Sequence, residues 1–485
     1  MSLPDRKDNI QNTSDDVITD TLPIDPNSGL SRGLQTRHLS MMALAGIIGP
    51  GLLVGAGGAL ASGGPASLLI GFGVIGLIAF SIMQSLGELT TLYPSSGSFI
   101  SLTSRFSTPP SASHGLWRSG ILARVAEIER FGCVFYLLDY LCGGGLKGQD
   151  HTLGFQYWHD PGAFADGFRG VAKVFVFCST FYAGCESIAV AAAETRNPKH
   201  AVPLAIRQVF WRIIFIYMGS ALFFGMTCPW NAEGLASAGS KALRSPMTVA
   251  IQNAGWEGGV HLINAFILAT CLSAVNSSIY IGSRTILFLA QEGHAPRFLR
   301  FTDQRGVPIY AIIFTNLFGA LSMMNVSSGA GAAYNYIVNL SGVSTFLVWG
   351  SISFIHIRFR SAWKAQGRRI SDLPFVSFAY PYNAYFGLVA NVFLALVQGW
   401  TTLSPFSAGD FVDAYILLAL FPLIWAGYKI WFKTRIWDLR EVDLDEGRRN
   451  DLDPTEAGGF ESLEDGEGSE VSKKLPLWRR IVKNF

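Results

Sequence analysis

Apolar segments long enough to cross a membrane recur along this chain of 485 residues. They lie near residues 40–62, 66–88, 171–193, 208–228, 258–281, 309–325, 333–357, 384–404 and 412–433. Each is close to the roughly twenty residues that a helix needs to cross the hydrocarbon core. Because hydrocarbon offers no partners to free backbone groups, such segments must be helical. The sequence therefore predicts an all-α polytopic membrane protein whose spanning region covers residues 39–433.

Basic residues are distributed unevenly between the loops. They gather ahead of the first segment and in alternate loops near 196–207, 284–305 and 358–369, whereas 325–332 and 404–410 contain almost none. Loops rich in Lys and Arg face the cytoplasm. We therefore expect both tails, residues 1–38 and 434–485, to be cytoplasmic. Their polar and acidic composition predicts disorder in the first tail and from Asp438 onward.

The alternation of loops requires an odd number of crossings between residues 95 and 170. Only Ile121–Cys142 offers one, and this segment contains Arg124, Glu127, Glu129, Arg130 and Asp139. Each charge at the bilayer centre costs about 2.5–3.5 kcal/mol. The crossing is poor, so we count nine good spans and one weak one.

The first apolar segment has an unusual composition. Gly46–Gly58 contains six glycines and Pro50. Gly49-Pro50-Gly51 removes one backbone donor and leaves nearby amides and carbonyls without helical partners. Transporters place such breaks at a substrate site in mid-membrane. The alternative is a surface where small residues let helices pack closely.

Two later segments contain candidate site residues. Glu186 lies beside Gly184 within an apolar span, where a carboxylate is costly unless it faces a cavity. Its alternative is a buried carboxylate hydrogen-bonded to a helix end. Ser273 and Asn276 are three residues apart on one helix face. They either line a substrate path or bond neighbouring helices.

Other site chemistry is missing from the sequence. The chain has six cysteines without a CxxC pair and eight histidines without ligand spacing, which predicts no metal site and no cofactor. No histidine box, catalytic carboxylate pair or nucleophile–base set indicates an enzyme. The net charge of +2 argues neither for nor against a nucleic-acid partner. No basic cluster is interleaved with aromatic residues, so no nucleic-acid partner is predicted.

Short motifs occur in order along most of the chain. They include Arg37-His38, Leu86-Gly87-Glu88, Tyr157–Phe164, Gly184-Cys185-Glu186, Asn197-Pro198-Lys199, Arg305–Pro308, Val338–Ser341 and Ile357–Arg360. Together they resemble the fungal, yeast-type amino acid permeases of the amino acid–polyamine–organocation superfamily. The resemblance covers roughly residues 32–106 and 143–445.

The resemblance implies an inverted-repeat fold of twelve spans with two broken helices, and proton-coupled amino acid uptake across the plasma membrane. It implies that amides near Ile48, Gly49, Pro50 and Gly51 bind the substrate carboxylate. Carbonyls of both breaks would hold the substrate amino group, the second break being Tyr182-Ala183-Gly184-Cys185-Glu186. The implied partners are an amino acid, protons and membrane lipid.

The chain departs from the family pattern in two places. Pro50 lacks the amide hydrogen of the residue that the family usually has there. The stretch that holds three spans in relatives is short here, so we expect the third to fifth helices of the first repeat to be absent or degenerate around residues 111–145. The predicted fold then has 9–10 spans instead of 12.

The leading functional prediction is secondary active transport of amino acids by alternating access, driven by protons. The alternative is a degenerate or truncated permease that does not transport, or a nutrient-sensing receptor. A membrane-embedded enzyme is disfavoured because no catalytic set is present.

Overall fold

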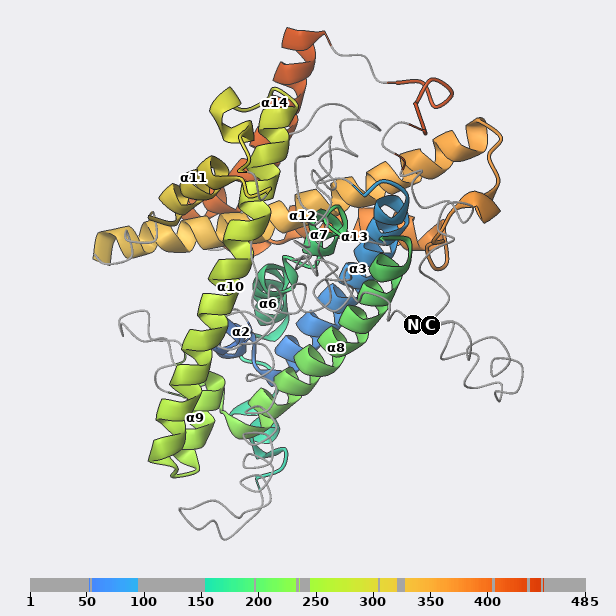
Figure 1. Ribbon diagram of the computed structural model, residues 1–485. Coiled ribbons are helices and arrows are strands. Elements are labelled where there is room, and N and C mark those ends of the chain that lie inside the picture. Colours follow the sequence, from blue (N-terminus) through green and yellow to red (C-terminus); the bar gives the residue numbers. More distant parts are fainter. Residues whose placement is uncertain are drawn as a thin grey trace, which may run out of the picture.

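The computed structural model describes residues 55–94, 153–195, 198–232, 245–303, 306–320, 328–403, 406–433 and 437–445, together with Leu52, Leu235 and Arg448. Within these residues the fold is helical (Figure 1). The α-helices are α2 (Ala56–Gly63), α3 (Pro65–Leu92), α6 (Gly167–Tyr182), α7 (Ser187–Ala192), α8 (Pro198–Thr227), α9 (Pro246–Asn253), α10 (Glu257–Gln291), α11 (Ile309–Gly319), α12 (Ser328–Ala365), α13 (Tyr382–Val397) and α14 (Ala408–Phe432). Short turns of other helix types are η2 (Trp158–Gly162), η3 (Arg297–Arg300), η5 (Ile370–Asp372) and η6 (Trp400–Thr402).

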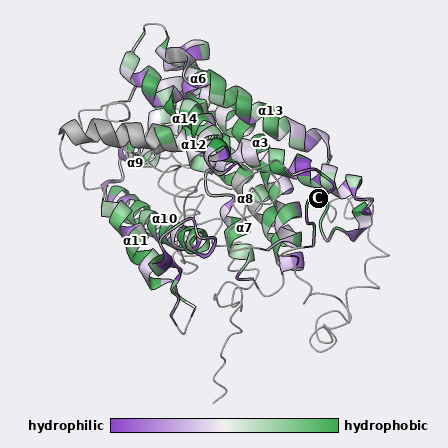
Figure 2. Ribbon diagram, turned by 90° about the horizontal axis from the view of Figure 1, so that it is seen from above, coloured by the Kyte–Doolittle hydropathy of each residue, from purple (hydrophilic) through white to green (hydrophobic). Residues whose placement is uncertain are grey.

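The helices match the apolar segments of the sequence. Five among the described residues are long and apolar enough to cross a membrane: Pro65–Leu92, Gly167–Ala192, Glu257–Gln291, Gly342–Ala365 and Ala408–Trp431. Shorter apolar helices cover Ile214–Thr227, Ile309–Gly319 and Tyr382–Val397. Hydrophobic residues predominate along α3, α10, α13 and α14 (Figure 2). The prediction of an all-helical polytopic membrane protein is therefore confirmed.

The turn between α2 and α3 follows from two adjacent residues. Gly64 has φ +83°, and its amide donates to Leu60 O at 2.8 Å to end α2. Pro65 then begins α3, where a missing amide hydrogen costs nothing. The segment before α6 is bonded to this turn, since Ala165 N donates to Gly63 O at 3.0 Å.

Close helix contacts position α6 in the core. A Cβ built on Gly63 would lie 2.5 Å from Val174 Cγ2, and one built on Gly170 would lie 2.9 Å from Gly63 Cα. Only glycine allows α2 and α6 to approach this closely. The α3 helix packs on α6 and α8, whereas α12 packs mainly on α13 and also contacts α3 and α6 (Figure 1).

The segment Trp437–Asp445 folds back onto the helices, although the sequence predicts disorder from Asp438. Tyr93 Oη donates to Leu444 O at 2.7 Å, and Gln366 Nε2 donates to Val442 O at 2.7 Å. Val442 and Leu444 are buried against the ends of α3 and α12. These two apolar side chains anchor an otherwise acidic segment, whose overall composition alone predicted disorder.

Candidate functional site: a broken helix

A break interrupts the apolar span Gly167–Ala192. The helix α6 ends at Tyr182, Ala183 takes ψ 138°, Gly184 has φ +102°, and α7 resumes at Ser187. Gly184 is suited to this break because L side chains rarely adopt its backbone conformation. The structure thus contains a helix break at the position that the sequence predicts for the second break.

Neighbouring helices hold the break in place through two tyrosine hydroxyl groups, one of which satisfies a carbonyl at the end of α6. Tyr217 of α8 donates its hydroxyl to Phe181 O at 2.7 Å, and Tyr182 donates its own to Phe72 O of α3 at 3.0 Å. The two tyrosine rings are stacked with centroids 4.5 Å apart. Because the Tyr182 side chain is buried and bonded to α3, it supports the break and does not extend into open space.

Glu186 lies directly after the turn. Its Oε2 accepts hydrogen bonds from Gly184 N at 3.1 Å and from Trp349 Nε1 of α12 at 3.3 Å. Within the described part of the chain, no cationic side chain lies within ion-pair distance of this half-buried carboxylate. The hydrogen-bonded helix end anticipated as the alternative is therefore present, and the negative charge is still without a cation there.

The glycine-rich segment of the first span reaches the same place. A Cβ on Gly55 would lie 2.7 Å from the Phe181 ring, so this residue packs against the last turn of α6. Leu52 is also buried. Ile48, Gly49, Pro50 and Gly51 lie outside the described residues, and their part in a first break stays a prediction.

The two polar candidates on α10, Ser273 and Asn276, have different surroundings. The buried stripe of α10 contains Ile263, Phe266, Thr270, Ser273, Ser277 and Tyr280. Ser273 lies on this stripe, whereas Asn276 lies on a neighbouring, half-buried face. Ser277 was missed by sequence reasoning, although it is four residues after Ser273 on the same face. Whether Ser273 and Asn276 touch substrate stays a prediction.

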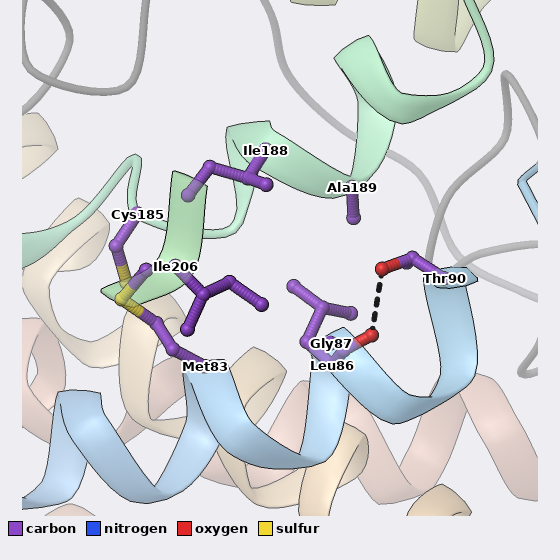
Figure 3. A pocket seen from close by; sticks show the side chains of 8 residues that line it. All are labelled: Met83, Leu86, Gly87, Thr90, Cys185, Ile188, Ala189 and Ile206. Carbon is purple, nitrogen blue, oxygen red and sulfur yellow. Dashed lines mark hydrogen bonds between the residues drawn. The ribbon is translucent and has the colours of Figure 1, made fainter. Parts of the chain in front are cut away.

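A narrow apolar crevice lies beside the break. Its lining comes from α3, α8 and the Cys185–Ala189 stretch (Figure 3): Met83, Leu86, Gly87, Thr90, Cys185, Ile188, Ala189 and Ile206. These side chains leave no space large enough for a water molecule. In this state, side chains therefore fill the space between the break and the end of α3 along this crevice.

That end of α3 carries a second buried carboxylate, Glu88. Arg360 Nη2 of α12 donates to Glu88 Oε2 at 3.0 Å, and Arg360 Nε forms an ion pair with Oε1 at 2.6 Å. Ser377 N donates to Oε2 at 2.7 Å, and His356 Nε2 lies 3.2 Å from Oε1. Glu88 and His356 are fully buried. The cluster therefore joins α3 to α12.

A similar pair joins α7 to α10. Arg284 Nε donates to Glu194 Oε1 at 2.8 Å, and the guanidinium lies 4.1 Å from the centre of the Tyr280 ring. Both charged side chains are nearly buried. The charges of Arg284 and Glu194 compensate each other. The pair therefore fastens the end of α7 to α10 and is not a substrate site.

Comparison with known proteins identifies the family. The model of the amino acid permease family matches residues 38–116 and 132–441. The general amino acid permease AGP3 of Saccharomyces cerevisiae is 45% identical, with 98% of this chain and 95% of that protein covered. The basic amino-acid permease and the general amino-acid permease GAP1 of the same yeast are each 33% identical, over 87% and 93% of this chain and 84% and 85% of those proteins.

The match also bears on the middle of the chain. The family model matches up to residue 116 and again from residue 132. It therefore does not support the expectation that helices around 111–145 are absent or degenerate, and residues 95–152 lie outside those the structure describes. With the family matched over most of its length, this chain belongs to the amino acid permease family and is a membrane transporter, not an enzyme.

Proposed function

We propose that this amino acid permease carries its substrate with protons across the plasma membrane by alternating access. The helix break at Ala183–Glu186 is the observation on which the proposal depends. A break inside an apolar span is tolerated where the freed groups face protein or a cavity, and transporters use it to bind polar substrates. The family's inverted-repeat fold would supply the second half of that site.

The substrate amino group would lie close to Glu186. An ammonium group placed there meets a carboxylate that no described cation neutralises, together with the helix-end carbonyls of the break. The substrate carboxylate would bind amides near Ile48, Gly49 and Gly51, with Pro50 unable to donate. The packing of Gly55 against Phe181 supports this placement, because it brings the glycine-rich segment of the first span next to the end of α6, where the break begins.

The plasma membrane is proposed from the yeast relatives, and the cytoplasmic position of both termini from the basic loops. An epitope tag at each terminus tests the orientation. We expect antibodies to reach both tags only after the cells are permeabilised. Labelling of either tag on intact cells would contradict it.

Uptake by intact cells tests the function. The full chain is expressed in a yeast strain that lacks general amino acid permeases, and a panel of the twenty radiolabelled amino acids is offered at acidic and neutral pH. We expect saturable uptake that is faster at acidic pH and is lost when a protonophore dissipates the gradient. Uptake that a protonophore leaves unchanged would refute proton coupling while leaving transport in place.

A matched pair of variants assigns the break. Glu186→Gln keeps the shape of the side chain and removes its charge, whereas His294→Gln changes an exposed residue outside the helices. We expect the first variant to lose uptake at normal surface expression, and the second to transport like the wild type. Full uptake by Glu186→Gln would exclude Glu186 from the binding of the amino group.

A further inference from the structure

Polar side chains from three helices meet in the core, away from the break. Ser81, Ser85 and Glu88 lie on one face of α3, at intervals of four and three residues. Matching faces of α12 and α13 complete what we call the polar column, which consists of Ser81, Ser85, Glu88, Ser353, His356, Arg360, Asn383 and Asn391. Polar residues buried inside a membrane protein at this density are expensive and usually serve function.

Contacts show that the three faces are joined. Ser81 Oγ donates to Asn383 O at 2.6 Å, and Asn383 Nδ2 returns a bond to Ser81 O at 3.3 Å. A Cβ built on Gly387 of α13 would lie 2.6 Å from Ser81 Oγ and 2.7 Å from Ser353 Oγ. Gly387 therefore leaves room for both hydroxyl groups beside α13.

Several polar atoms of the column are buried without a bond inside the described part of the protein. They are Ser85 Oγ, Ser353 Oγ, Asn391 Oδ1, Glu88 Oε1, Arg360 Nε and both ring nitrogens of His356, although ion pairs join the last three residues to one another. Buried polar atoms are normally hydrogen-bonded, and each exception indicates an unmet partner or a special role. An unsatisfied set that lies along one row is what a path for water or protons requires.

We propose that the pair Glu88–His356, reached through the polar column, is a proton-binding site separate from the substrate site at the break. This inference deepens the proposed proton coupling and depends on it. His356 Nε2 lies 3.2 Å from Glu88 Oε1, which is ion-pair distance, so a proton bound by the imidazole would face the carboxylate. Neither ring nitrogen of His356 has a hydrogen-bond partner among the described residues, so the imidazole has a nitrogen that can accept the proton.

The charges around His356 determine how much free energy the bound proton costs. The charged and titratable groups that face it are Glu88 from α3, Arg360 from its own helix, and Tyr380 from the segment before α13, whose ring centre is 5.3 Å from the imidazole. Glu88 and Arg360 already neutralise each other. A proton on His356 therefore adds a net positive charge to a fully buried cluster, which is costly.

Separation of α3 from α12 would relieve that cost by admitting water. Proton binding and helix separation are therefore favoured together, by linkage. The α3 helix packs mainly on α6 and α8, which form and support the break, whereas α12 packs mainly on α13 and has fewer contacts with α3 and α6. A proton in this cluster would thus favour movement of the break-bearing helices away from α12.

Reconstituted protein tests the inference. Purified full-length chain is placed in liposomes that contain a pH-sensitive dye, with the membrane potential clamped by valinomycin and potassium. The amino acid that the wild type takes up fastest in the panel above is added outside. Lumenal acidification reports proton entry, and counterflow of the same radiolabelled amino acid reports substrate binding and translocation without net proton movement.

His356→Gln retains an amide that can donate to Glu88 but cannot accept the proton, and His294→Gln is the matched control. We expect His356→Gln to lose lumenal acidification while counterflow persists, and the control to match the wild type in both. Acidification by His356→Gln at the wild-type rate would overturn the proton site alone. A wild-type chain that gives counterflow without acidification would overturn the proposed coupling, and this site with it.

A second variant decides the matter if His356→Gln does not fold. Ser353→Ala removes one hydroxyl of the polar column, one helical turn from His356, without adding volume. We expect slower lumenal acidification with unchanged counterflow. Acidification at the wild-type rate in Ser353→Ala would then overturn the polar column as the route to the proton site.

Discussion

Glu186 and Glu88 are both carboxylates in apolar spans, and their surroundings differ in burial and in the charge of their partners. Glu88 is fully buried and paired with Arg360, with His356 beside it. Glu186 is half-buried and accepts bonds from neutral donors, Gly184 N and Trp349 Nε1. The paired carboxylate holds helices together, whereas the one without a described cation can receive a cationic group from outside the chain.

The largest effect is expected at the paired carboxylate. Glu88→Ala would leave Arg360 buried without its partner, at a cost of about 3–5 kcal/mol in unfolding free energy. Thermal unfolding in detergent should show a much lower midpoint than for Glu186→Ala. Equal midpoints for the two variants would break the distinction between them.

The second-largest effect is expected at Gly184, in the turn beside Glu186. Gly184→Ala places a Cβ on a residue with φ +102°, and such strain costs about 1–3 kcal/mol. Gly219→Ala, in the interior of α8 with open space at its Cβ, is the control and should be neutral or slightly stabilising. If both alanine variants unfold at the wild-type temperature, Gly184 is not required by the break.

A smaller effect is expected when the hydrogen bond by which α8 supports the break is removed. Tyr217→Phe removes the hydroxyl that donates to Phe181 O, at about 1 kcal/mol, and should also weaken substrate affinity. Tyr310→Phe changes a half-exposed residue and is the control. Unfolding midpoints and uptake KM values for both variants give the measurement. Unchanged values for Tyr217→Phe would mean that the break is stable without this bond.

The exposed pair Arg368–Asp445 should matter least and sharpens the contrast with the buried one. Arg368 holds the pKa of the Asp445 carboxyl below its usual value through a hydrogen bond, and Asp445 in turn raises the pKa of Arg368. Because the pKa of Asp445 is lowered in the folded state, the pair stabilises above the usual aspartate pKa and is lost as pH falls through the folded value.

Arg368→Gln should cost less than about 1 kcal/mol at neutral pH, since both side chains are solvent-exposed in part. High salt should reduce the difference further. Unfolding midpoints at low and high salt measure it. A loss comparable to that of Glu88→Ala would show that the docked segment Trp437–Asp445, and not the buried cluster, fastens α3 to α12.

The sequence predicted the helices from local causes, and the family resemblance implied the second break at a place that the residues also mark. An apolar run of sufficient length must be helical, and Gly184 beside Glu186 is a visible interruption. The contacts of Glu88 were out of reach, since Arg360 and Ser377 are 272 and 289 residues away in sequence.

The same reason explains two other differences. The docking of Val442 and Leu444 depends on the distant residues Tyr93 and Gln366, and composition alone predicted disorder there. The polar column forms only because polar faces of three helices, α3, α12 and α13, meet in the fold. The polar residues of α3 and α12 recur at helical spacing in the sequence, but the sequence does not show that these two faces meet. Sequence spacing can identify a polar face but not the face that it meets.

Direct binding of substrate to the purified protein tests the central claim, that the break at Glu186 holds the amino acid. Scintillation proximity with the radiolabelled substrate would compare the wild type, Glu186→Gln and Gly219→Ala, each with its unfolding midpoint. The account predicts that Glu186→Gln loses binding at an unchanged midpoint, while Gly219→Ala binds like the wild type. Wild-type affinity in Glu186→Gln would contradict it.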